Sequence, residues 1–378
     1  MPTIDTSQRY TKGLKMAWRE ITASRHGFTR LLHALAGKLQ GKMQMTYLLG
    51  LPTYISIELT NRCACTCALC PVGQRIYSRR LGNMSWKQFT WLVDQVSSHA
   101  RFIGLYNWGD PFLHPRVYDM ISYVASKKIY VKVSSTLRNW DPEQAERLVR
   151  TGLDDLKVSL HGASEETYRD YQPSHTRTDI SFTDALEKVR AIQLAKLRLG
   201  LTKPNITLGF IVTRNNEHEI DEFLEIARQL GVDYSLEETS LNLRFLPYDR
   251  MMRSKDLDEA SLQRERKALT ERWLPKEDRY VNEYYRFIRT HHGFLPPANP
   301  KWFSCEWPWQ QTVISSNGDV NLCCGSYAIN DRIGNVFELP LRKIWNNALY
   351  RAARRNIACR TGTNTTHVLC ADCPGRLL

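Results

Sequence analysis

The stretch from Cys63 to Cys70 reads CACTCALC and follows a short apolar run at residues 54–59. Its thiols fit the pattern Cys63-x3-Cys67-x2-Cys70, which places three of them on one short loop. Three thiolates can hold three irons of a [4Fe–4S] cube and leave the fourth iron open to another ligand. The remaining thiol, Cys65, is expected to be a bystander, with substitution for Cys63 or Cys67 as the alternative.

A zinc site is the other use to which these thiols could be put. Zinc typically takes paired ligands such as C-x2-C, with a second pair elsewhere in the chain. Here all the candidates lie within one short stretch, and the next cysteine-rich region lies far downstream. The spacing therefore favours a cluster that is held by three thiolates.

The composition is that of a soluble globular protein. Of the 378 residues, 42% are hydrophobic and 24% are charged, which suits one large domain or a large domain plus a small one. There is no run of about 18 uncharged apolar residues, and the N-terminus lacks an apolar signal segment, so we expect no membrane span and a cytoplasmic location. In that compartment, ten cysteines favour metal or redox ligation over disulfides.

The chain is basic, with a formal net charge of +13. Residues 12–42 are locally basic, and Glu20 is their only acid. A solvated helical face would explain this charge, and so would contact with an anionic substrate, an acidic partner, a membrane surface or RNA. No RNA-binding motif accompanies the charge, so nucleic acid is not the expected partner.

Residues 1–50 predict two helical stretches, at 11–22 and 28–39, on the outside of the main domain. One face of the second stretch is apolar, and its members are Leu31, Leu32, Leu35 and Leu39. Apolar residues at this spacing usually contact the core, so a core contact is expected here rather than a docking site.

Strand-like and helix-like segments alternate from residue 54 to about residue 238. The expected strands span residues 55–59, 102–106, 130–134, 155–160, 206–212 and 234–236. The expected helices between them span residues 85–97, 115–127, 142–151, 182–199 and 219–230. This alternation predicts an α/β fold with a parallel sheet and right-handed crossovers.

The residues before the cysteines, TNR at 60–62, end the first expected strand. Together with the cysteine spacing, this segment resembles the radical S-adenosylmethionine (SAM) superfamily. The resemblance implies a partial (β/α)6 TIM-type barrel, with ligands at the C-terminal ends of the strands. It also implies that the open iron binds SAM and that an electron from the cluster splits SAM into methionine and a 5′-deoxyadenosyl radical. A flavodoxin- or ferredoxin-type protein is the expected electron donor.

The second expected strand is followed by NWGDP at residues 107–111. This segment resembles the Gly-Gly-Glu motif of the superfamily, which implies that Gly109 and Asp110 bind the methionine ammonium group. Trp108 replaces the first glycine of the motif. Asp110 is one methylene shorter than glutamate, so the backbone must approach more closely. A plain Gly-Asp-Pro turn is the alternative.

Further motifs follow the third and fourth expected strands. The segment SSTL at 134–137 stands where relatives often carry Ser-Thr-Asn, which implies that Ser134 and Thr136 contact SAM near its ribose or carboxylate. The segment VSLHG at 158–162 resembles the Ser-Leu-Asp-Gly of many members, which directs Ser159 at the ribose hydroxyls.

His161 takes the place of the aspartate in that last motif. An unperturbed imidazole titrates near neutral pH, so His161 is the candidate catalytic residue, as a substrate contact or a proton acceptor. A structural histidine is the alternative. Further on, Gln172 stands where relatives have an arginine, and Arg169 is the candidate for supplying the lost cation near the SAM carboxylate.

A second set of cysteines lies near the C-terminus and consists of Cys305, Cys323, Cys370 and Cys373. Four thiolates fit either one zinc ion or one fully ligated iron–sulfur cluster. The order Cys-x12-Gly-x4-Cys, a gap, then Cys-x2-Cys resembles the twitch half of the SPASM extension of radical SAM enzymes, which implies one auxiliary [4Fe–4S] cluster. Cys324 and Cys359 are left over, as packing residues or as a hydrogen-atom donor to a substrate radical.

Four regions follow from these patterns. They are a helical extension at 1–50, a radical SAM partial barrel at 51–238, a helical insertion at 239–302 and a SPASM- or twitch-like domain at 303–378. The insertion either covers the substrate or links the two domains.

The expected activity is radical chemistry on a polar small molecule such as a sugar or an aminocyclitol. An anionic substrate would also suit the basic chain. The 5′-deoxyadenosyl radical would take a hydrogen atom, and the auxiliary cluster would accept an electron. A peptide-modifying maturase and a sugar epimerase or dehydratase are the alternative enzymes. An iron–sulfur scaffold protein is the non-enzymatic alternative, which the strand-end motifs disfavour.

Overall fold

The computed structural model describes residues 26–76, 79–174, 181–241, 243, 258–294, 305–359 and 368–371. The helix expected at residues 11–22, part of the insertion expected at 239–302, the side chain of Cys359 and the whole of Cys373 lie outside this description. Within the described ranges, no helix is long and apolar enough to cross a membrane.

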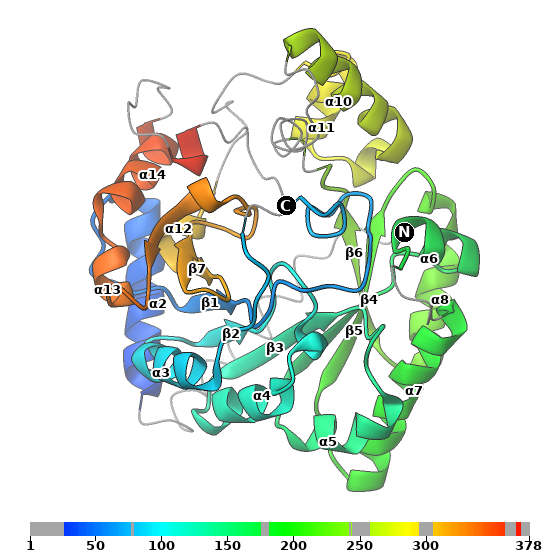
Figure 1. The fold of residues 1–378 in the computed structure, drawn as a ribbon, viewed down its shortest axis with the longest axis horizontal. Helices are drawn as coiled ribbons and strands as arrows, with labels where there is room; N and C mark the ends of the chain where they lie inside the picture. The colour runs from blue at the N-terminus through cyan, green and yellow to red at the C-terminus, as the bar shows by residue number, and fades with distance from the viewer. Residues whose placement is uncertain are drawn as a thin grey trace.

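A nine-stranded sheet runs through the molecule in the order β6-β5-β4-β3-β2-β1-β7-β8-β9 (Figure 1). The first six strands in the chain are parallel, and each pairs with the next. They are β1 (Tyr54–Ile57), β2 (Phe102–Gly104), β3 (Tyr130–Ser135), β4 (Asp155–Ser159), β5 (Asn205–Val212) and β6 (Asp233–Glu238). In the described part of the chain, β6 pairs with β5 alone, so the barrel stays open. This confirms the expected partial (β/α)6 architecture.

Helices connect these strands and cover the outside of the sheet (Figure 1). They are α3 (Trp86–Val96), α4 (Val117–Ser126), α5 (Ala145–Arg150), α6 (Glu165–Tyr171), α7 (Phe182–Leu199) and α8 (Ile220–Leu230). Helix α3 begins at Ser85 because a capping box with Gln88 satisfies its first amides. Helix α7 ends at Gly200, whose φ of 62° lies in the left-handed region that favours glycine.

Strand β3 separates apolar from polar residues by simple alternation. Val131 and Val133 are buried beneath the helices, whereas Lys132 and Ser134 are partly buried. Strand β4 repeats the pattern, with Lys157 as a partly buried polar residue. Because successive side chains of a strand point to opposite faces, the polar residues face the inside of the open barrel. The interior is therefore a polar site and not a hydrophobic core.

The C-terminal region continues the same sheet beyond β1. Its strands are β7 (Gln311–Ile314), β8 (Asp319–Asn321) and β9 (Arg332–Asn335), and its helices are α12 (Trp307–Gln310), α13 (Leu341–Ile344) and α14 (Ala348–Cys359). Strand β7 pairs in parallel with β1, whereas β8 and β9 follow in antiparallel order. This continuity of the sheet was not predicted from the sequence, and the domain boundary at residue 303 stays a prediction.

Helix α2 (Gly27–Lys42) lies at the edge of the molecule, close to the C-terminal helices (Figure 1). Small residues let it approach them: a Cβ added at Gly37 would lie 2.9 Å from the carbonyl oxygen of Trp309, and one at Gly41 would lie 3.3 Å from the same tryptophan side chain. Arg30 is fully buried and donates hydrogen bonds to carbonyl oxygens of Ser97 and Lys128. The inner face of α2 is therefore built from small and hydrogen-bonded residues.

The core contact that we expected for the leucines of this helix was wrong for three of the four, whereas Leu31 is partly buried. The exposed fractions are 50% for Leu32, 54% for Leu35 and 59% for Leu39. The reason is that glycines and the buried arginine already occupy the face that packs on the rest of the molecule.

Helices α10 (Glu259–Trp273) and α11 (Glu283–Thr290) form a pair beside β6 (Figure 1). Trp273 and Tyr285 belong to a separate apolar cluster with Leu69 of the cysteine loop and Tyr171 at the end of α6. The described part of the predicted insertion therefore packs against the cysteine loop.

Candidate active site

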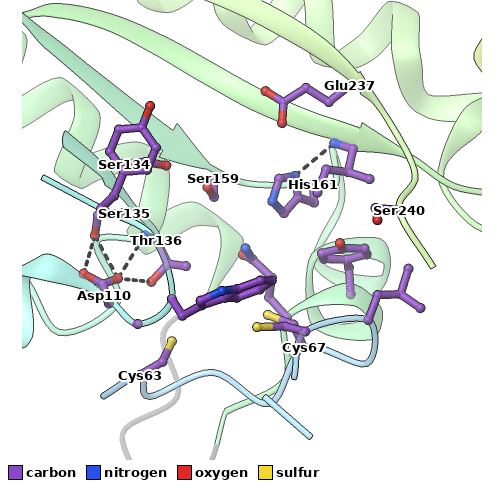
Figure 2. Close-up of a pocket in the computed structure, with 18 of the residues that line it drawn as sticks. Cys63, Cys67, Asp110, Ser134, Ser135, Thr136, Ser159, His161, Glu237 and Ser240 are labelled. Carbon is purple, nitrogen blue, oxygen red and sulfur yellow. Dashed lines mark hydrogen bonds between the residues drawn. The ribbon is translucent and has the colours of Figure 1, made fainter. Parts of the chain in front are cut away.

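A cavity of about 650 Å³ opens where the parallel strands end (Figure 2). This is the edge at which parallel α/β folds commonly bind ligands. Most of the predicted site residues near the first cysteine loop line this cavity. They are Cys63, Cys67, Cys70, Gly109, Asp110, Ser134, Thr136, Ser159 and His161. Motifs from four separate strand ends therefore meet in one cavity.

Cys65 is buried within the cysteine loop and does not line this cavity. Cys65 is 1% exposed, its thiol lies 3.8 Å from the hydroxyl of Thr136, and its backbone forms a bridge with Ser174. The loop also needs glycine at position 73, because a Cβ there would lie 2.5 Å from the carbonyl oxygen of Cys67. These contacts hold the loop in a shape that presents three thiols and buries the fourth.

The three thiols are suited to a cluster more than to a single ion. Within the described ranges, no three His, Cys, Asp or Glu side chains could share one metal ion, whereas thiolates around a four-iron cube are spread over its surface. A hydrogen bond with Cys65, together with burial, raises the pKa of both Cys63 and Cys67, and burial raises the pKa of Cys70. Since the ligand is a thiolate, cluster binding must displace these protons.

Gly109 brings the end of the second strand against the cysteine loop. Its φ of 103° lies in the left-handed region that favours glycine. A Cβ there would lie 2.4 Å from the carbonyl oxygen of Thr60. The next amide, of Asp110, donates to the carbonyl oxygen of Arg62 at 2.8 Å. Glycine is therefore required where the two strand ends meet.

The carboxylate of Asp110 ties this turn to the end of β3 (Figure 2). It accepts hydrogen bonds from the hydroxyl of Ser135 at 2.8 and 2.9 Å, and from the amide and hydroxyl of Thr136 at 3.1 and 3.0 Å. The amide of Phe112 donates a further bond at 3.0 Å. Burial raises the pKa of Asp110. Ser135 was not among the predicted site residues; alternation along β3 places its side chain on the face opposite that of Ser134.

His161 lines the cavity, but the backbone holds its imidazole. Nδ1 accepts the amide hydrogen of Ile211 at 3.0 Å, so the ring hydrogen of the neutral form lies on Nε2. Burial lowers the pKa of His161 to about 3, which keeps the ring neutral near physiological pH. The edge of the ring contacts Tyr171, with centroids 4.8 Å apart. This arrangement leaves Nε2 as a hydrogen-bond donor, and a catalytic role for His161 stays a prediction.

Glu237 is a cavity residue that the sequence analysis missed. It lies on β6, forms an ion pair with Lys157 of β4 and accepts a hydrogen bond from Ser235 at 2.7 Å. Burial opposes its charge, but the ion pair and the hydrogen bond outweigh burial and hold its pKa below the ordinary value of 4.5. The cavity therefore contains an ionised carboxylate. It lies one residue beyond the strand expected at 234–236, at the edge of the sheet where ligands commonly bind.

Three members of the second cysteine set, Cys305, Cys323 and Cys370, lie in the part of the chain that the structure describes. Cys305 precedes α12, Cys323 follows β8, and Cys370 is buried against the core at 8% exposure. The hairpin turns at Gly318, whose φ is 87° and where a Cβ would lie 2.3 Å from the ring of Phe337. The spacing Gly-x4-Cys thus corresponds to a tight turn and one strand.

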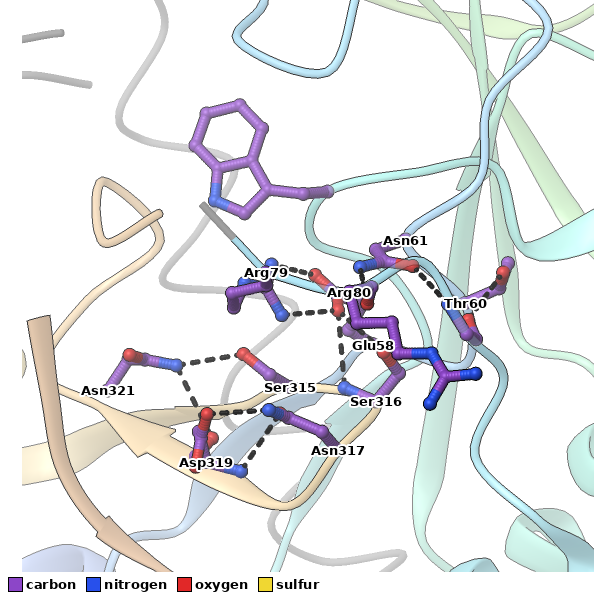
Figure 3. Close-up of polar contacts among 12 residues, drawn as sticks. Glu58, Thr60, Asn61, Arg79, Arg80, Ser315, Ser316, Asn317, Asp319 and Asn321 are labelled. Atoms are coloured by element: carbon purple, nitrogen blue, oxygen red, sulfur yellow. Dashed lines mark hydrogen bonds and ion pairs between the residues drawn. The ribbon is translucent and has the colours of Figure 1, made fainter. Parts of the chain in front are cut away.

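A buried ion pair joins the two cysteine regions (Figure 3). Glu58, directly after β1, is 1% exposed and accepts hydrogen bonds from Arg79 at 2.9 and 3.0 Å. The same carboxylate accepts the amide and the hydroxyl of Ser316 at 3.2 and 3.0 Å. Ser316 lies between β7 and β8, so the strand that leads into the first cysteine loop is fixed to the hairpin that leads to Cys323.

Comparison with known families agrees with this geometry. The radical SAM superfamily matches residues 57–227, and the SPASM iron–sulfur cluster-binding domain matches residues 305–374. The chain is a radical SAM enzyme with a C-terminal SPASM domain. Its first region binds a [4Fe–4S] cluster and SAM, and its SPASM region binds a further iron–sulfur cluster.

Two curated relatives of this radical SAM enzyme match most of its length, and a third matches about half. The PqqA peptide cyclase of Streptomyces rochei is 25% identical over 342 residues, which cover 86% of this chain and 83% of the relative. The AdoMet-dependent heme synthase of Methanosarcina barkeri is also 25% identical, over 86% of this chain and 92% of the relative. The mycofactocin maturase MftC of Mycobacterium tuberculosis is 28% identical over 48% of this chain and 44% of the relative.

Solved structures show the same fold at low sequence identity. Streptococcus suis SuiB bound to S-adenosylmethionine superposes with a TM-score of 0.58 at 15% identity, over 97% of this chain and 83% of that chain. SuiB bound to its precursor peptide SuiA gives the same TM-score at 13% identity, over 98% and 84%.

The cavity of this radical SAM enzyme offers polar groups that fit SAM. The side-chain nitrogen of Asn107 and the side-chain oxygen of Gln172 are buried and have no hydrogen-bond partner in the described part of the chain. Buried polar groups usually need a partner, and the amino, carboxylate and ribose groups of SAM offer donors and acceptors. Arg169, by contrast, lies on α6, is about half exposed, pairs with Glu165 and is not in the cavity lining.

Proposed function

We propose that this radical SAM enzyme modifies a side chain of a peptide. The observation that carries the proposal is the match to the PqqA peptide cyclase, which extends over most of both chains. The partial match to the mycofactocin maturase supports it. These relatives favour the peptide alternative over the sugar or aminocyclitol substrate that we expected from the sequence.

The size of the cavity supports entry of one side chain at a time. A volume of about 650 Å³ lies within the range of roughly 300–1,000 Å³ that suits one small ligand. After SAM is bound, the remaining space suits a single side chain and not a folded peptide. The peptide backbone would then lie at the mouth of the cavity. There it would be near the apolar side-chain cluster that contains Leu69, Tyr171 and Trp273 and packs against α10 and α11.

The residues that would hold the cofactors follow from the geometry of the cavity. Cys63, Cys67 and Cys70 would bind the first cluster, with Asn107 and Gln172 as polar contacts for SAM. When bound, the reduced cluster and SAM supply a 5′-deoxyadenosyl radical that removes a hydrogen atom from a C–H bond. His161 would donate a hydrogen bond from Nε2 to SAM or to the substrate.

Glu237 is our candidate for the group that accepts a proton from the substrate. Net oxidation of a side chain removes a hydrogen atom, a proton and an electron, so the proton needs an acceptor in the cavity. The pKa of Glu237 is held below its ordinary value, so its carboxylate is ionised and available. His161 is less suited, because its Nδ1 is occupied by the amide of Ile211. The SPASM cysteines would hold the cluster that receives the electron.

The test is an anaerobic assay of the reconstituted enzyme with SAM and dithionite. Short peptides encoded beside its gene are compared with sugars and aminocyclitols as substrates. We expect a peptide to raise 5′-deoxyadenosine formation and to change in mass. The proposal is wrong if every peptide leaves the rate at its basal level while a sugar or an aminocyclitol raises it and is converted.

A further inference from the structure

Helix α2 turns its large apolar residues outward. The exposed fractions are 64% for Phe28, 50% for Leu32, 54% for Leu35, 59% for Leu39 and 64% for Met43. These positions recur every three or four residues, so they form one stripe along the helix. In the described part of the chain, nothing covers this stripe. An apolar surface of this kind usually marks a site of interaction.

The surroundings of the stripe are cationic. Lys38 and Lys42 are exposed on the same helix, and the chain has no acidic residue from position 21 to position 57. Among acidic residues of neighbouring helices, Asp94 forms an ion pair with Lys127, and Glu306 accepts a hydrogen bond from Gln310. Two further exposed apolar residues, Tyr47 and Leu49, follow the helix at 56% and 79% exposure.

We propose that α2 docks this enzyme on the surface of an anionic phospholipid bilayer. An apolar stripe with lysines beside it lies in the plane of the interface, where the apolar side chains enter the acyl boundary and the lysines meet anionic headgroups. The helix has 16 residues, fewer than the roughly 20 needed to cross a bilayer. It would therefore lie on the membrane and not span it.

Charge favours the bilayer over two other candidates that could cover the stripe, a second copy of the chain and residues 1–25. A second copy of the chain would bring the same cationic, acid-free helix against α2, and like charges oppose that contact. Residues 1–25 carry five basic and two acidic residues, so this segment also has a net positive charge. An anionic lipid surface has the opposite sign, and the basic residues at 1–25 would add to the attraction.

The experiment is co-sedimentation of the full chain with lipid vesicles. One set contains phosphatidylcholine alone, and the other contains added phosphatidylglycerol. We expect binding to the second set that weakens as salt is raised. The triple variant Leu32→Gln, Leu35→Gln, Leu39→Gln should bind at least about tenfold more weakly, because the apolar stripe is lost. Lys38→Glu with Lys42→Glu should weaken binding by roughly fivefold per lysine.

A matched control replaces exposed leucines elsewhere. Leu194→Gln with Leu197→Gln alters two α7 residues that are 55% and 78% exposed, and its vesicle binding should equal that of the unaltered chain. All replaced side chains face solvent, and circular dichroism should show an unchanged fold.

Four results would overturn the proposal. The first is that the full chain does not bind phosphatidylglycerol vesicles, and the second is that the α7 control loses as much vesicle binding as the α2 triple variant. The third is that the full chain is a dimer and the α2 triple variant is a monomer. The fourth is that the protein binds vesicles only after residues 1–25 are deleted.

Discussion

Asp110 serves two strand ends with one carboxylate. Its oxygens accept hydrogen bonds from Ser135, Thr136 and Phe112, so they are already engaged before any ligand binds. A contact with the SAM ammonium group, which the Gly-Gly-Glu resemblance implies, would have to share these oxygens. The residue therefore combines a structural role with a proposed binding role, and the two can be separated by mutation.

Asp110→Ala should weaken SAM binding while both clusters remain loaded. Loss of a hydrogen bond to a charged group costs about 1.5–3 kcal/mol, which corresponds to roughly 10- to 150-fold in affinity. Ser135→Ala is the matched control, since it removes a neutral hydrogen-bond donor to the same carboxylate. It should lower the free energy of SAM binding by about 0.5–1.5 kcal/mol at most. Titration of SAM against the spectrum of the cluster measures both. Equal affinities in all three proteins would mean that Gly109 and Asp110 form only a turn.

Glu237→Gln should separate radical formation from product formation. We expect 5′-deoxyadenosine to form nearly as before, while product falls by roughly 10²- to 10⁴-fold because the proton acceptor is lost. Ser240→Ala is a control that alters the cavity without removing a carboxylate or a predicted SAM contact. If Glu237→Gln leaves the yield of product unchanged, the proton goes to another group.

The protonation of His161 and Glu237 predicts how the rate and the stability of the protein depend on pH. Burial lowers the pKa of His161 to about 3, and the pKa of Glu237 lies below 4.5, so neither changes charge between about pH 6 and 8. The rate should therefore show no histidine-like inflection in that interval. Since its folded pKa is lowered, Glu237 adds stability above its ordinary pKa of 4.5, and that stability is lost as the pH falls through the lowered value.

At the scale of elements, Glu58 adds a buried ion pair and hydrogen bonds to the pairing of β1 with the β7–β8 hairpin. Its carboxylate and the guanidinium of Arg79 are 1% and 7% exposed. Glu58→Ala leaves a buried, uncompensated arginine, which should lower the free energy of unfolding by about 3–5 kcal/mol. The control Arg190→Ala breaks an exposed pair with Glu187 on α7 and should cost less than about 1 kcal/mol. Denaturant unfolding of the two variants tests this difference, and equal losses would contradict it.

For the whole molecule, the seven predicted thiolates imply two clusters and about eight irons. Replacing Cys63, Cys67 and Cys70 with alanine should leave about four irons and abolish SAM cleavage. Cys65→Ala is the control, because its thiol does not line the cavity and its loss should spare both iron and activity. Iron analysis and a 5′-deoxyadenosine assay decide the matter. An unchanged iron content in the triple variant would refute the ligand assignment.

Cys323→Ser should affect the reaction only after the hydrogen atom has been removed. The auxiliary set offers four thiolates and leaves no iron open to SAM, so 5′-deoxyadenosine should still form while oxidised product is lost. We choose Cys323 because it is partly exposed, whereas Cys370 is buried in the core and its replacement would disturb packing. Normal yields of product would indicate a structural site.

The sequence alone determined the chemistry of the loop at Cys63–Cys70, the alternation of strands and helices, and most strand-end residues of the cavity. The loop and the alternation depend on short spacings and on the periods of strands and helices, which are local properties of the chain. The strand-end residues came from the resemblance to the radical SAM superfamily. The same resemblance drew attention to position 172, where Gln172 lines the cavity. Arg169, which was expected to supply the missing cation, lies outside it.

Only the tertiary structure decided which distant side chains meet. The ion pair of Glu237 with Lys157 requires β5 to lie between their strands, and the bond of Ser316 to Glu58 requires β7 to pair with β1. The outward leucines of α2 were mispredicted because the helical period gives a face but not its direction. That direction was fixed by Gly37, Gly41 and the long-range bonds of Arg30, since long-range packing decides which side of an element is buried.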